Sequence, residues 1–314
     1  MQEKVIDLLL KYKSSFESEK EPLGAIIGHE LDIILNVEKP YPPLLRTPAY
    51  PAIPRAREAL EVHIKELKDL GVLRKVGHNE QVEVTTPVII AWNNGKSQMV
   101  GDFRALNTYT IPDRYPIPRT HETLTKFKED KHITSMDYLK DFHQNFLKED
   151  SRKILRIIVH FSIYKYLRMA FGIKKNAPYH YQRMMNTIFP EQSSPGGLII
   201  YSDDITVCSE SWESHLTRLE RFSQKIVQVN MKISLKTCCF TYNELTELGH
   251  VLSGLRLGID KNKVAAVLLK PMPQTKKNCN NFKDFLFIIE RLLNNLQKLK
   301  NHCKISVTNR KYFK

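Results

Sequence analysis

The sequence predicts an α+β fold, in which antiparallel β-hairpins are backed on one side by amphipathic helices. Two β-prone runs, residues 198 to 200 and residues 205 to 207, flank a short polar segment, which is typical of a tight hairpin. A second hairpin is expected within residues 82 to 104, where Asn94 and Gly95 separate two apolar runs. In other stretches the apolar residues recur every three or four positions, the spacing of a helix with one buried face.

The first third of the chain is expected to hold two helices separated by a proline-rich connector. Residues 1 to 18 carry apolar side chains at helical spacing, namely Val5, Leu8, Leu9 and Tyr12. Residues 40 to 54 contain six prolines, a density that excludes a helix and favours an extended chain. An ordered connector is the preferred interpretation of this segment, and a docking motif is the alternative. Leu60, Ile64 and Leu67 then mark the buried stripe of a helix that ends at Gly71.

Three further helices are expected in the second half of the chain. Residues 176 to 188 form one of them, with Pro178 in its first turn. The other two are recognised by apolar stripes, which are Leu216, Leu219, Phe222, Ile226 and Val229 in one and Phe282, Leu286, Ile289, Leu293 and Leu296 in the other.

Composition narrows the class of protein and the kind of partner. The 314 residues can bury a core in two or three subdomains. The 48 Lys and Arg residues exceed the 34 Asp and Glu residues, and the net charge of +14 favours nucleic acid as a partner over a merely basic surface. The five cysteines form no Cys-x-x-Cys pair, so a reducing compartment fits. Neither a membrane span nor a signal peptide is expected.

Asp203 and Asp204 are adjacent carboxylates at the expected tip of the hairpin formed by residues 198 to 207. Neighbouring like charges repel each other, and a divalent cation such as Mg²⁺, which takes oxygen ligands, would relieve that repulsion. Asp137, at the end of another short run, supplies a third carboxylate. Three carboxylates on two adjacent strands suit a two-cation site for phosphoryl transfer. The alternative for Asp203 and Asp204 is that they are solvated turn residues.

Six short motifs follow one another between residues 101 and 251. They are Gly-Asp-Phe-Arg-Ala-Leu-Asn at 101–107, Arg-Tyr-Pro-Ile-Pro-Arg at 114–119, Met-Ala-Phe-Gly at 169–172, Asn-Ala-Pro at 176–178 with Gln182, Tyr-Ser-Asp-Asp at 201–204 and Glu-Leu-Gly-His-Val at 247–251. Each motif alone is weak, but their order resembles that of the reverse transcriptase domain in the Pol polyprotein of Ty3/gypsy-type long-terminal-repeat retrotransposons. The resemblance covers residues 40 to 290.

The resemblance implies a right-hand polymerase fold with fingers, a palm whose antiparallel sheet is backed by helices, and a partial thumb or connection. The implied domains are an N-terminal extension (1–39), a proline-rich connector with the fingers (40–130), the palm (131–253) with a fingers insertion at roughly 150–168, and a truncated thumb or connection (254–314). The chain would then be a fragment of a larger polyprotein or a truncated genomic copy.

The implied activity is RNA- or DNA-templated DNA synthesis, in which a dNTP is added to a primer 3′-hydroxyl with two Mg²⁺ ions, Mn²⁺ being the alternative metal. The implied partners are an RNA template, a DNA primer or RNA–DNA hybrid, dNTPs, the RNase H and integrase parts of a parent polyprotein, and a second copy in a homodimer; no membrane is expected. The expected location is the cytoplasm, within a retroelement particle, or the nucleus.

The resemblance also assigns roles to individual residues. Asp137, Asp203 and Asp204 would be the catalytic metal ligands. Phe142 would exclude a 2′-hydroxyl by the shape of its ring, a core aromatic being the alternative. Lys236 would protonate the leaving pyrophosphate, unless it is simply a lysine in a basic segment.

The other implied roles concern the substrates. Phe171 and Gly172 would lie near the nucleotide sugar, with Gln182 on the following helix. Arg104 and Lys96 would also bind substrate. Leu248, Gly249 and His250 would form the primer grip, the turn that steers the primer end toward the aspartates.

The sequence departs from the family pattern around the nucleotide site. Gln98 occupies an arginine position, Trp92 and Asn93 replace lysines, and Asp141 replaces the glycine before Phe142. In the family, the arginine and lysines at positions 98, 92 and 93 grip the triphosphate. Their replacement is therefore expected to weaken nucleotide binding. A working polymerase and a catalytically impaired descendant that only binds nucleic acid are therefore both open. An interaction module without a nucleic-acid role is the third alternative, and it leaves the charge and the ordered motifs unexplained.

Overall fold

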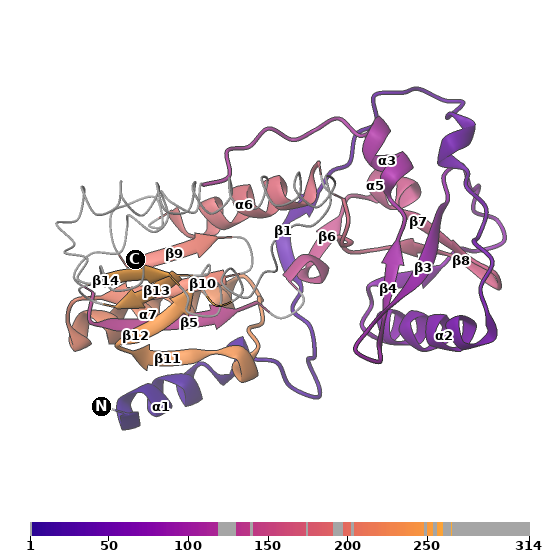
Figure 1. The fold of residues 1–314 in the computed structure, drawn as a ribbon. Helices are drawn as coiled ribbons and strands as arrows, with labels where there is room; N and C mark the ends of the chain where they lie inside the picture. Colours follow the sequence, from indigo (N-terminus) through magenta and orange to yellow (C-terminus); the bar gives the residue numbers. More distant parts are fainter. Residues whose placement is uncertain are drawn as a thin grey trace, which may run out of the picture. The chain divides into compact units, whose positions relative to one another are not determined.

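The computed structural model describes residues 2–118, 130–138, 141–173, 175–190, 197–201, 204–247, 250–253, 256–259 and 265 (Figure 1). The chain divides into two compact units. The first comprises residues 1–117, 137–190 and 221–236, and the second comprises residues 118–136, 191–220 and 237–314. Helices and strands both contribute to the described chain, so the predicted α+β class is confirmed.

A five-stranded sheet in the order β2-β8-β7-β3-β4 forms the larger part of the first unit. Its strands are β2 (Leu73–Lys75), β3 (Thr86–Asn93), β4 (Lys96–Gly101), β7 (Arg156–Val159) and β8 (Ser162–Tyr166). All neighbours pair antiparallel except β3 and β7, which are parallel. The predicted hairpin within residues 82 to 104 is confirmed, since β3 and β4 pair through a turn in which Asn94 and Gly95 have φ values of 48° and 79°. Two consecutive positive φ values are characteristic of the type I′ turn that Asn-Gly favours.

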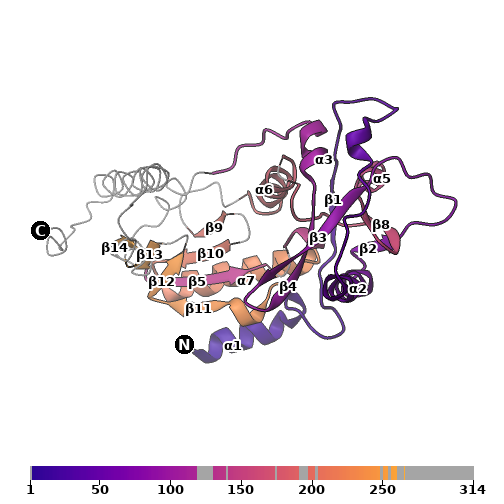
Figure 2. The ribbon, with the colours of Figure 1, turned by 45° about the vertical axis from the view of Figure 1, so that its right-hand side comes forward.

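Helix α2 (Pro54–Asp69) packs against β2, β3 and β4, and Figures 1 and 2 show it running along one face of the sheet. Leu60 and Ile64 are buried in that contact, as the sequence predicts. Pro54 occupies the first turn, where its missing N–H is not needed. Gly71 has a φ of 66° just beyond the helix end, which confirms the predicted C-terminal glycine.

The other elements of the first unit are short. They are α1 (Gln2–Lys11), η1 (Lys13–Ser15), β1 (Ile26–Leu31), η2 (Pro43–Leu45), α3 (Arg104–Tyr109), η3 (Asp141–Gln144), β6 (Asn145–Leu147), α5 (Glu149–Ile154), α6 (Ala177–Ile188) and η5 (Leu235–Thr237). Strands β1 and β6 pair in parallel. Within the proline-rich residues 40 to 54, the predicted exclusion of a helix is confirmed except at the single turn η2 and at Pro54, which is the first residue of α2.

Two predicted helices of the second half are confirmed. Helix α6 begins immediately after Asn176 and carries proline in its first turn. Helix α7 (Trp212–Gln228) buries Leu219, Phe222 and Ile226 along one face. The Phe222 ring stacks on Phe189 at a centroid distance of 5.3 Å, which joins the C-terminal end of α6 to the second half of α7 inside the first unit. The last predicted helix, at residues 282 to 296, lies outside the described part of the chain.

A four-stranded sheet in the order β11-β5-β10-β9 forms the described centre of the second unit. Its strands are β5 (His132–Asp137), β9 (Leu198–Tyr201), β10 (Asp204–Ser209) and β11 (Cys239–Tyr242). A three-stranded antiparallel sheet follows, made of β12 (Glu244–Glu247), β13 (His250–Ser253) and β14 (Arg256–Ile259). Ile133, Ile199, Cys208 and Leu252 form a common core for the two sheets.

The first half of α7 packs on one face of the four-stranded sheet, where His215 Nε2 and Thr134 Oγ1 are 2.8 Å apart. A helix therefore covers one face of this sheet, as the sequence predicts. The domain boundaries predicted from the sequence stay a prediction. Among the described helices, none combines the length and the apolar character that crossing a bilayer requires.

Candidate active site

The Tyr-Ser-Asp-Asp motif lies at the end of the hairpin that β9 and β10 form. Tyr201 pairs with Asp204 and Ile200 pairs with Ile205, so the predicted antiparallel hairpin is confirmed. The side chains of Ile200 and Ile205 are buried, and Asp204 is half-buried at the first position of β10. Asp203 lies outside the described residues. The buried strands therefore hold Asp204 at a fixed end of the sheet.

The opposite end of this hairpin is held by Arg218 of α7. The Arg218 guanidinium donates hydrogen bonds to the backbone carbonyl of Cys208 and, over 3.2 Å, to Ser209 Oγ. It also lies over Gly197, where φ is 112° and an added Cβ would come within 2.7 Å of Arg218 Cζ. A side chain at position 197 would thus displace the arginine that fixes the base of the hairpin.

Asp137 is the last residue of β5, and β5 lies next to β10 in the strand order of the sheet. The expectation that Asp137 and Asp204 come from adjacent strands is therefore confirmed. Asp137 is half-buried, and its backbone carbonyl accepts a hydrogen bond of 3.2 Å from the N–H of Ser234. Lys236 follows two residues later, with an exposed side chain in η5.

Asp137 and Asp204 have the carboxylate chemistry that Mg²⁺ selects. Within the described ranges, which omit Asp203, no group of three or more His, Cys, Asp or Glu side chains is arranged to hold a metal ion. The three-aspartate metal site therefore stays a prediction.

An aromatic cluster surrounds Phe142 in the first unit. The Phe142 ring lies 5.1 Å from the Phe171 ring and 5.8 Å from the ring of Tyr181, measured between centroids. Tyr181 is buried on α6, whereas 49% of Phe171 is exposed. The structure thus brings together Phe142 and Phe171, which the sequence places 29 positions apart. Tyr181 was not singled out from the sequence, because one more aromatic residue on a helix carries no local signal.

Gly172 joins two of the sequence motifs. Its φ is 95°, and a Cβ there would lie 3.2 Å from Cδ2 of the buried Phe103 ring. Its carbonyl accepts a hydrogen bond of 2.9 Å from Asn107 Nδ2. The motifs at 101–107 and 169–172 therefore form one packed structure, in which glycine is required for both conformation and space.

Arg104 begins α3 and is held by Asp102. The Arg104 Nε and Nη2 atoms donate to the two carboxylate oxygens of Asp102 over 2.7 and 2.6 Å. Tyr50 donates its hydroxyl to Asp102 Oδ2 over 2.7 Å. The hydrogen bonds from Arg104, helped by Tyr50, hold the pKa of Asp102 well below its usual range, and the same carboxylate raises the pKa of Tyr50.

Gln182 lies on α6, as expected, but its side chain is buried there. Gln182 Nε2 donates to Asn186 Oδ1 over 3.0 Å, and Asn186 Nδ2 donates to Tyr115 Oη over 2.6 Å. These bonds link α6 to the motif at 114–119 rather than directing Gln182 toward solvent. Its assignment to substrate binding stays a prediction.

The primer-grip assignment falls on a hairpin of the second unit. Strands β12 and β13 pair with Glu247 opposite His250, and His250 is buried at the first position of β13. Leu248 and Gly249 lie outside the described residues. The role of this hairpin as a primer grip stays a prediction.

The positions at which the sequence departs from the family pattern lie on two faces of the β3–β4 hairpin. Gln98 pairs with Ala91 and Lys96 pairs with Asn93, and all four residues are exposed. Trp92 pairs with Ser97 on the other face, where the guanidinium of Arg55 lies 4.0 Å from its ring centroid. Arg55 is, besides Lys96, a second basic residue at this hairpin, and the motifs do not reveal it.

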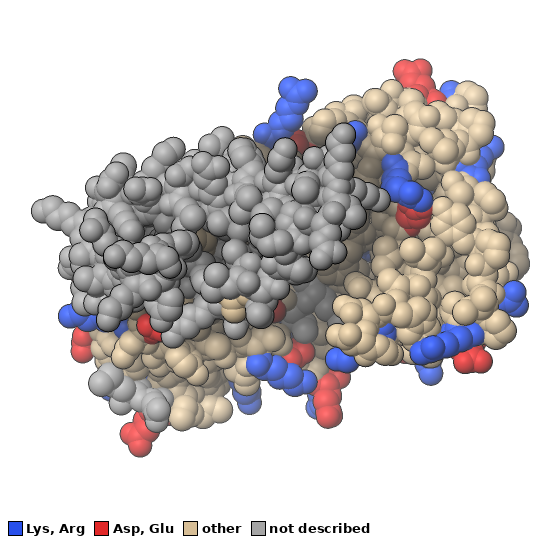
Figure 3. All heavy atoms as spheres, in the orientation of Figure 1, with Lys and Arg blue, Asp and Glu red and all other residues tan. Residues whose placement is uncertain are grey.

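The positive charge predicted to attract nucleic acid is dispersed on the face shown in Figure 3. There the described Lys and Arg side chains stand singly or in small groups, several of them beside Asp or Glu. The described residues on this face therefore present separate cations rather than one continuous basic patch.

Comparison with known proteins identifies the fold and the family. The family model described as reverse transcriptase (RNA-dependent DNA polymerase) matches residues 91–252. The chain is 32% identical over 275 residues to the retrovirus-related Pol polyprotein from transposon 297 of Drosophila melanogaster, covering 87% of the chain and 25% of that polyprotein. It is 25% identical to the transposon Tf2-3 polyprotein of Schizosaccharomyces pombe, covering 84% of the chain and 19% of that relative. The chain thus spans about a quarter or less of the length of these relatives.

Solved structures agree with this result. The foamy viral protease-reverse transcriptase in complex with RNA/DNA hybrid superimposes with a TM-score of 0.76 at 21% identity, covering 90% of this chain and 37% of the viral one. The same viral protein with double-stranded DNA gives a TM-score of 0.77 at 21% identity, with coverages of 89% and 47%. The right-hand polymerase fold expected from the motifs is therefore confirmed. The chain belongs to the reverse transcriptase family, with relatives among the Pol polyproteins of gypsy-type and Tf2 retrotransposons.

Proposed function

We propose that this domain copies an RNA or DNA template into DNA, adding nucleotides from dNTPs to a primer 3′-hydroxyl. The observation that carries the proposal is the Tyr201–Asp204 hairpin, which stands beside the strand that ends at Asp137. Two half-buried carboxylates on adjacent strands of a rigid sheet suit a reaction in which positioning and charge stabilisation supply most of the rate enhancement.

Asp137, Asp203 and Asp204 would hold two Mg²⁺ ions, or Mn²⁺ in their place. Their oxygen donors fit the preference of hard cations, and few protein carboxylates are needed because Mg²⁺ keeps several waters. When bound, the metal would supply positive charge for the attacking and departing oxygens. The work left to the protein is to position the primer, the template and the nucleotide.

The aromatic cluster would select the sugar of the nucleotide. The Phe142 ring packs against the rings of Phe171 and Tyr181, and this packing would hold it against a 2′-hydroxyl. Phe171 is half-exposed and would present its face to the sugar, while Gly172 allows a close approach of the backbone. Gln182, on α6, would also bind substrate.

The charged and loop residues would handle phosphates and the primer. Arg104 and Lys96 would contact phosphate groups, and Lys236, exposed two residues beyond Ser234, would donate a proton to the departing pyrophosphate. Leu248, Gly249 and His250 would steer the primer end. Relatives are polyproteins, which supports a parent polyprotein here, and its other parts would be RNase H and integrase. The viral neighbours are solved with RNA/DNA hybrid or double-stranded DNA, which supports a duplex partner. We further propose that the protein acts in the cytoplasm within a retroelement particle, or in the nucleus, and that it forms a homodimer.

A second candidate function is nucleic-acid binding without extension. It is favoured by Gln98, which is exposed opposite Ala91 and replaces an arginine of the family's triphosphate grip, leaving Lys96, opposite Asn93, as a cation on that face of the hairpin. Arg55 does not replace that grip in the structure, because it stacks on Trp92 on the other face.

One experiment separates the two candidates. Extension of a labelled DNA primer on an RNA template is measured with Mg²⁺, and binding of the same duplex is measured in parallel by fluorescence anisotropy. Extension together with salt-dependent binding supports the polymerase. Tight binding without extension supports the second candidate, and the absence of both excludes the two together.

A further inference from the structure

Tyr50 of the proline-rich connector reaches a residue 52 positions away in the sequence, Asp102. Its hydroxyl donates a hydrogen bond of 2.7 Å to Asp102 Oδ2. Asp102 follows β4, and its backbone N–H donates to the carbonyl of Pro87 over 2.8 Å. Only 13% of the Asp102 side chain is exposed. The carboxylate is therefore fixed at both its backbone and its side chain.

Arg104 lies on the exposed side of this carboxylate. Its Nε and Nη2 atoms donate to the two oxygens of Asp102, yet 87% of the arginine side chain is exposed. A guanidinium has five N–H groups, and the fork to Asp102 uses the edge formed by Nε and Nη2. The edge that contains Nη1 points away from Asp102 and retains the geometry that suits a phosphate oxygen.

The support under Arg104 is the packed structure that joins two motifs. The preceding residue, Phe103, is buried, and its ring Cδ2 lies 3.2 Å from the position of a Cβ on Gly172. One helical turn after Arg104, Asn107 donates to the Gly172 carbonyl. Arg104 thus stands on the same rigid structure as Gly172 and Phe171, the residues proposed to meet the nucleotide.

An exposed ion pair alone contributes little to stability and leaves both side chains mobile. This pair differs because a third residue, from a segment remote in sequence, completes the hydrogen bonding of the carboxylate. The charge-assisted bond from Tyr50 restricts Asp102 to one orientation, and that orientation sets the direction of the guanidinium. Such preorganisation lowers the entropic cost of binding an anion.

We propose that Tyr50 is a positioning residue, which acts through Asp102 to hold the Arg104 guanidinium ready for a phosphate oxyanion. The inference rests on the proposed function, because the phosphate belongs either to the nucleic-acid backbone or to the incoming nucleotide. Arg104 makes the contact, Asp102 orients it and Tyr50 fixes Asp102.

The test is a double-mutant cycle of Tyr50→Phe and Arg104→Ala, read by equilibrium binding. The Kd of a primer–template duplex is measured at several salt concentrations. The Kd of a dNTP is then measured on the complex with a dideoxy-terminated primer, so that no chemistry is required. Tyr12→Phe is the matched control, since it also removes a tyrosine hydroxyl that is hydrogen-bonded, in this case to Gln224.

Arg104→Ala is expected to weaken binding of the phosphate ligand about tenfold, the usual effect of losing one charge-assisted hydrogen bond. Tyr50→Phe is expected to weaken the same binding about threefold in the parent and to have no effect in the Arg104→Ala background. Tyr12→Phe is expected to leave both Kd values unchanged. If the domain extends primers, Tyr50→Phe should raise KM for the affected ligand while kcat stays within about twofold of the parent.

The two sources of phosphate give different results, and either one supports the proposal. For a backbone phosphate, the duplex Kd rises and its salt dependence falls by about one unit of slope. For the nucleotide, the dNTP Kd rises while the duplex Kd is unchanged. Additive effects in the double mutant, or unchanged binding by Tyr50→Phe, would overturn the proposal. A parent that binds but does not extend primers refutes the proposed polymerase while the binding cycle still decides the role of Tyr50.

Discussion

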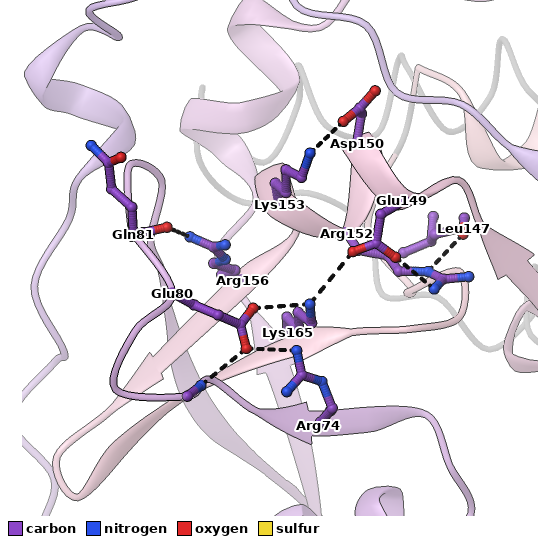
Figure 4. Close-up of polar contacts among 11 residues, drawn as sticks. Arg74, Glu80, Gln81, Leu147, Glu149, Asp150, Arg152, Lys153, Arg156 and Lys165 are labelled. Carbon is purple, nitrogen blue, oxygen red and sulfur yellow. Dashed lines mark hydrogen bonds and ion pairs between the residues drawn. The ribbon is translucent and has the colours of Figure 1, made fainter.

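Glu80 contacts several charged and polar groups at the five-stranded sheet and connects them in one network (Figure 4). Lys165 on β8 is only 7% exposed, and its Nζ lies 3.0 Å from Glu80 Oε2 and 3.6 Å from Glu149 Oε1. Glu80 Oε1 accepts hydrogen bonds from Arg74 Nη2 over 2.6 Å and from the N–H of Gly77 over 3.1 Å. The hydrogen bonds from Gly77 and Lys165 lower the pKa of Glu80 to about 2. Glu80 therefore neutralises a nearly buried lysine and closes the loop before β3.

We predict that Glu80→Gln destabilises the fold by about 2 kcal/mol. Removing one partner of a fully buried ion pair costs about 3–5 kcal/mol. The cost is smaller here because the Glu80 side chain is 27% exposed, Glu149 stays close to Lys165, and the glutamine oxygen can still accept a hydrogen bond. For a unit of this size, the expected fall in Tm is about 4–8 °C.

Urea unfolding at pH 7, followed by circular dichroism, measures this difference. Asp150→Asn is the matched control, because Asp150 pairs with Lys153 at 2.7 Å but is 87% exposed. Its expected effect is much smaller than that of Glu80→Gln, because an ion pair in water contributes little to stability. Equal losses in the two variants would refute the reasoning that burial of Lys165 sets the cost.

The pH dependence of the same variant provides a second check. Because the folded-state pKa of Glu80 is depressed, its contribution is fully present above the ordinary value of 4.5 and is lost as the pH falls toward about 2. The difference in stability between the parent and Glu80→Gln should therefore close over that range.

Two other predictions concern the second unit and the fingers. Burial lowers the pKa of His215 to about 4, so its contribution to stability is present above its ordinary pKa of 6.5 and is lost as the pH falls toward 4. His215→Gln should therefore flatten the pH dependence of the urea midpoint between these values. An unchanged pH dependence in the variant would contradict this prediction. Gln98→Arg should lower the KM for dNTP several-fold if the triphosphate grip is missing, and an unchanged KM would show that Lys96 or another cation already supplies it.

Sequence patterns within a few residues correctly predicted the turns and helices that neighbouring residues determine. The turn at Asn94 and Gly95 needs positive φ values, which these residue types accept, and the paired apolar runs around Asp204 could form only a hairpin with buried sides. The helices α2, α6 and α7 follow from apolar spacing in the same way. Metal-ligand and nucleotide roles, in contrast, came from the order of six motifs and not from any single pattern.

Many of the contacts that hold the candidate site and the five-stranded sheet together join residues that are remote in the sequence. Tyr50 and Asp102 are 52 positions apart, and Glu80 and Lys165 are 85 apart, so no periodicity connects them. The parallel pairing of β3 with β7 brings residues 156 to 159 into the sheet for the same reason. The burial of Gln182 depends on Asn186 and Tyr115, whose partnership appears only when α6 packs against the motif at 114–119.

The most direct measurement is Mg²⁺-dependent extension of a DNA primer on an RNA template by the parent and by Asp203→Asn, with Asp150→Asn as the carboxylate control. We predict extension by the parent and by the control, and no extension by Asp203→Asn, while all three bind the duplex with similar affinity. Extension by Asp203→Asn at the parental rate would contradict the assignment of the aspartates as the catalytic metal ligands.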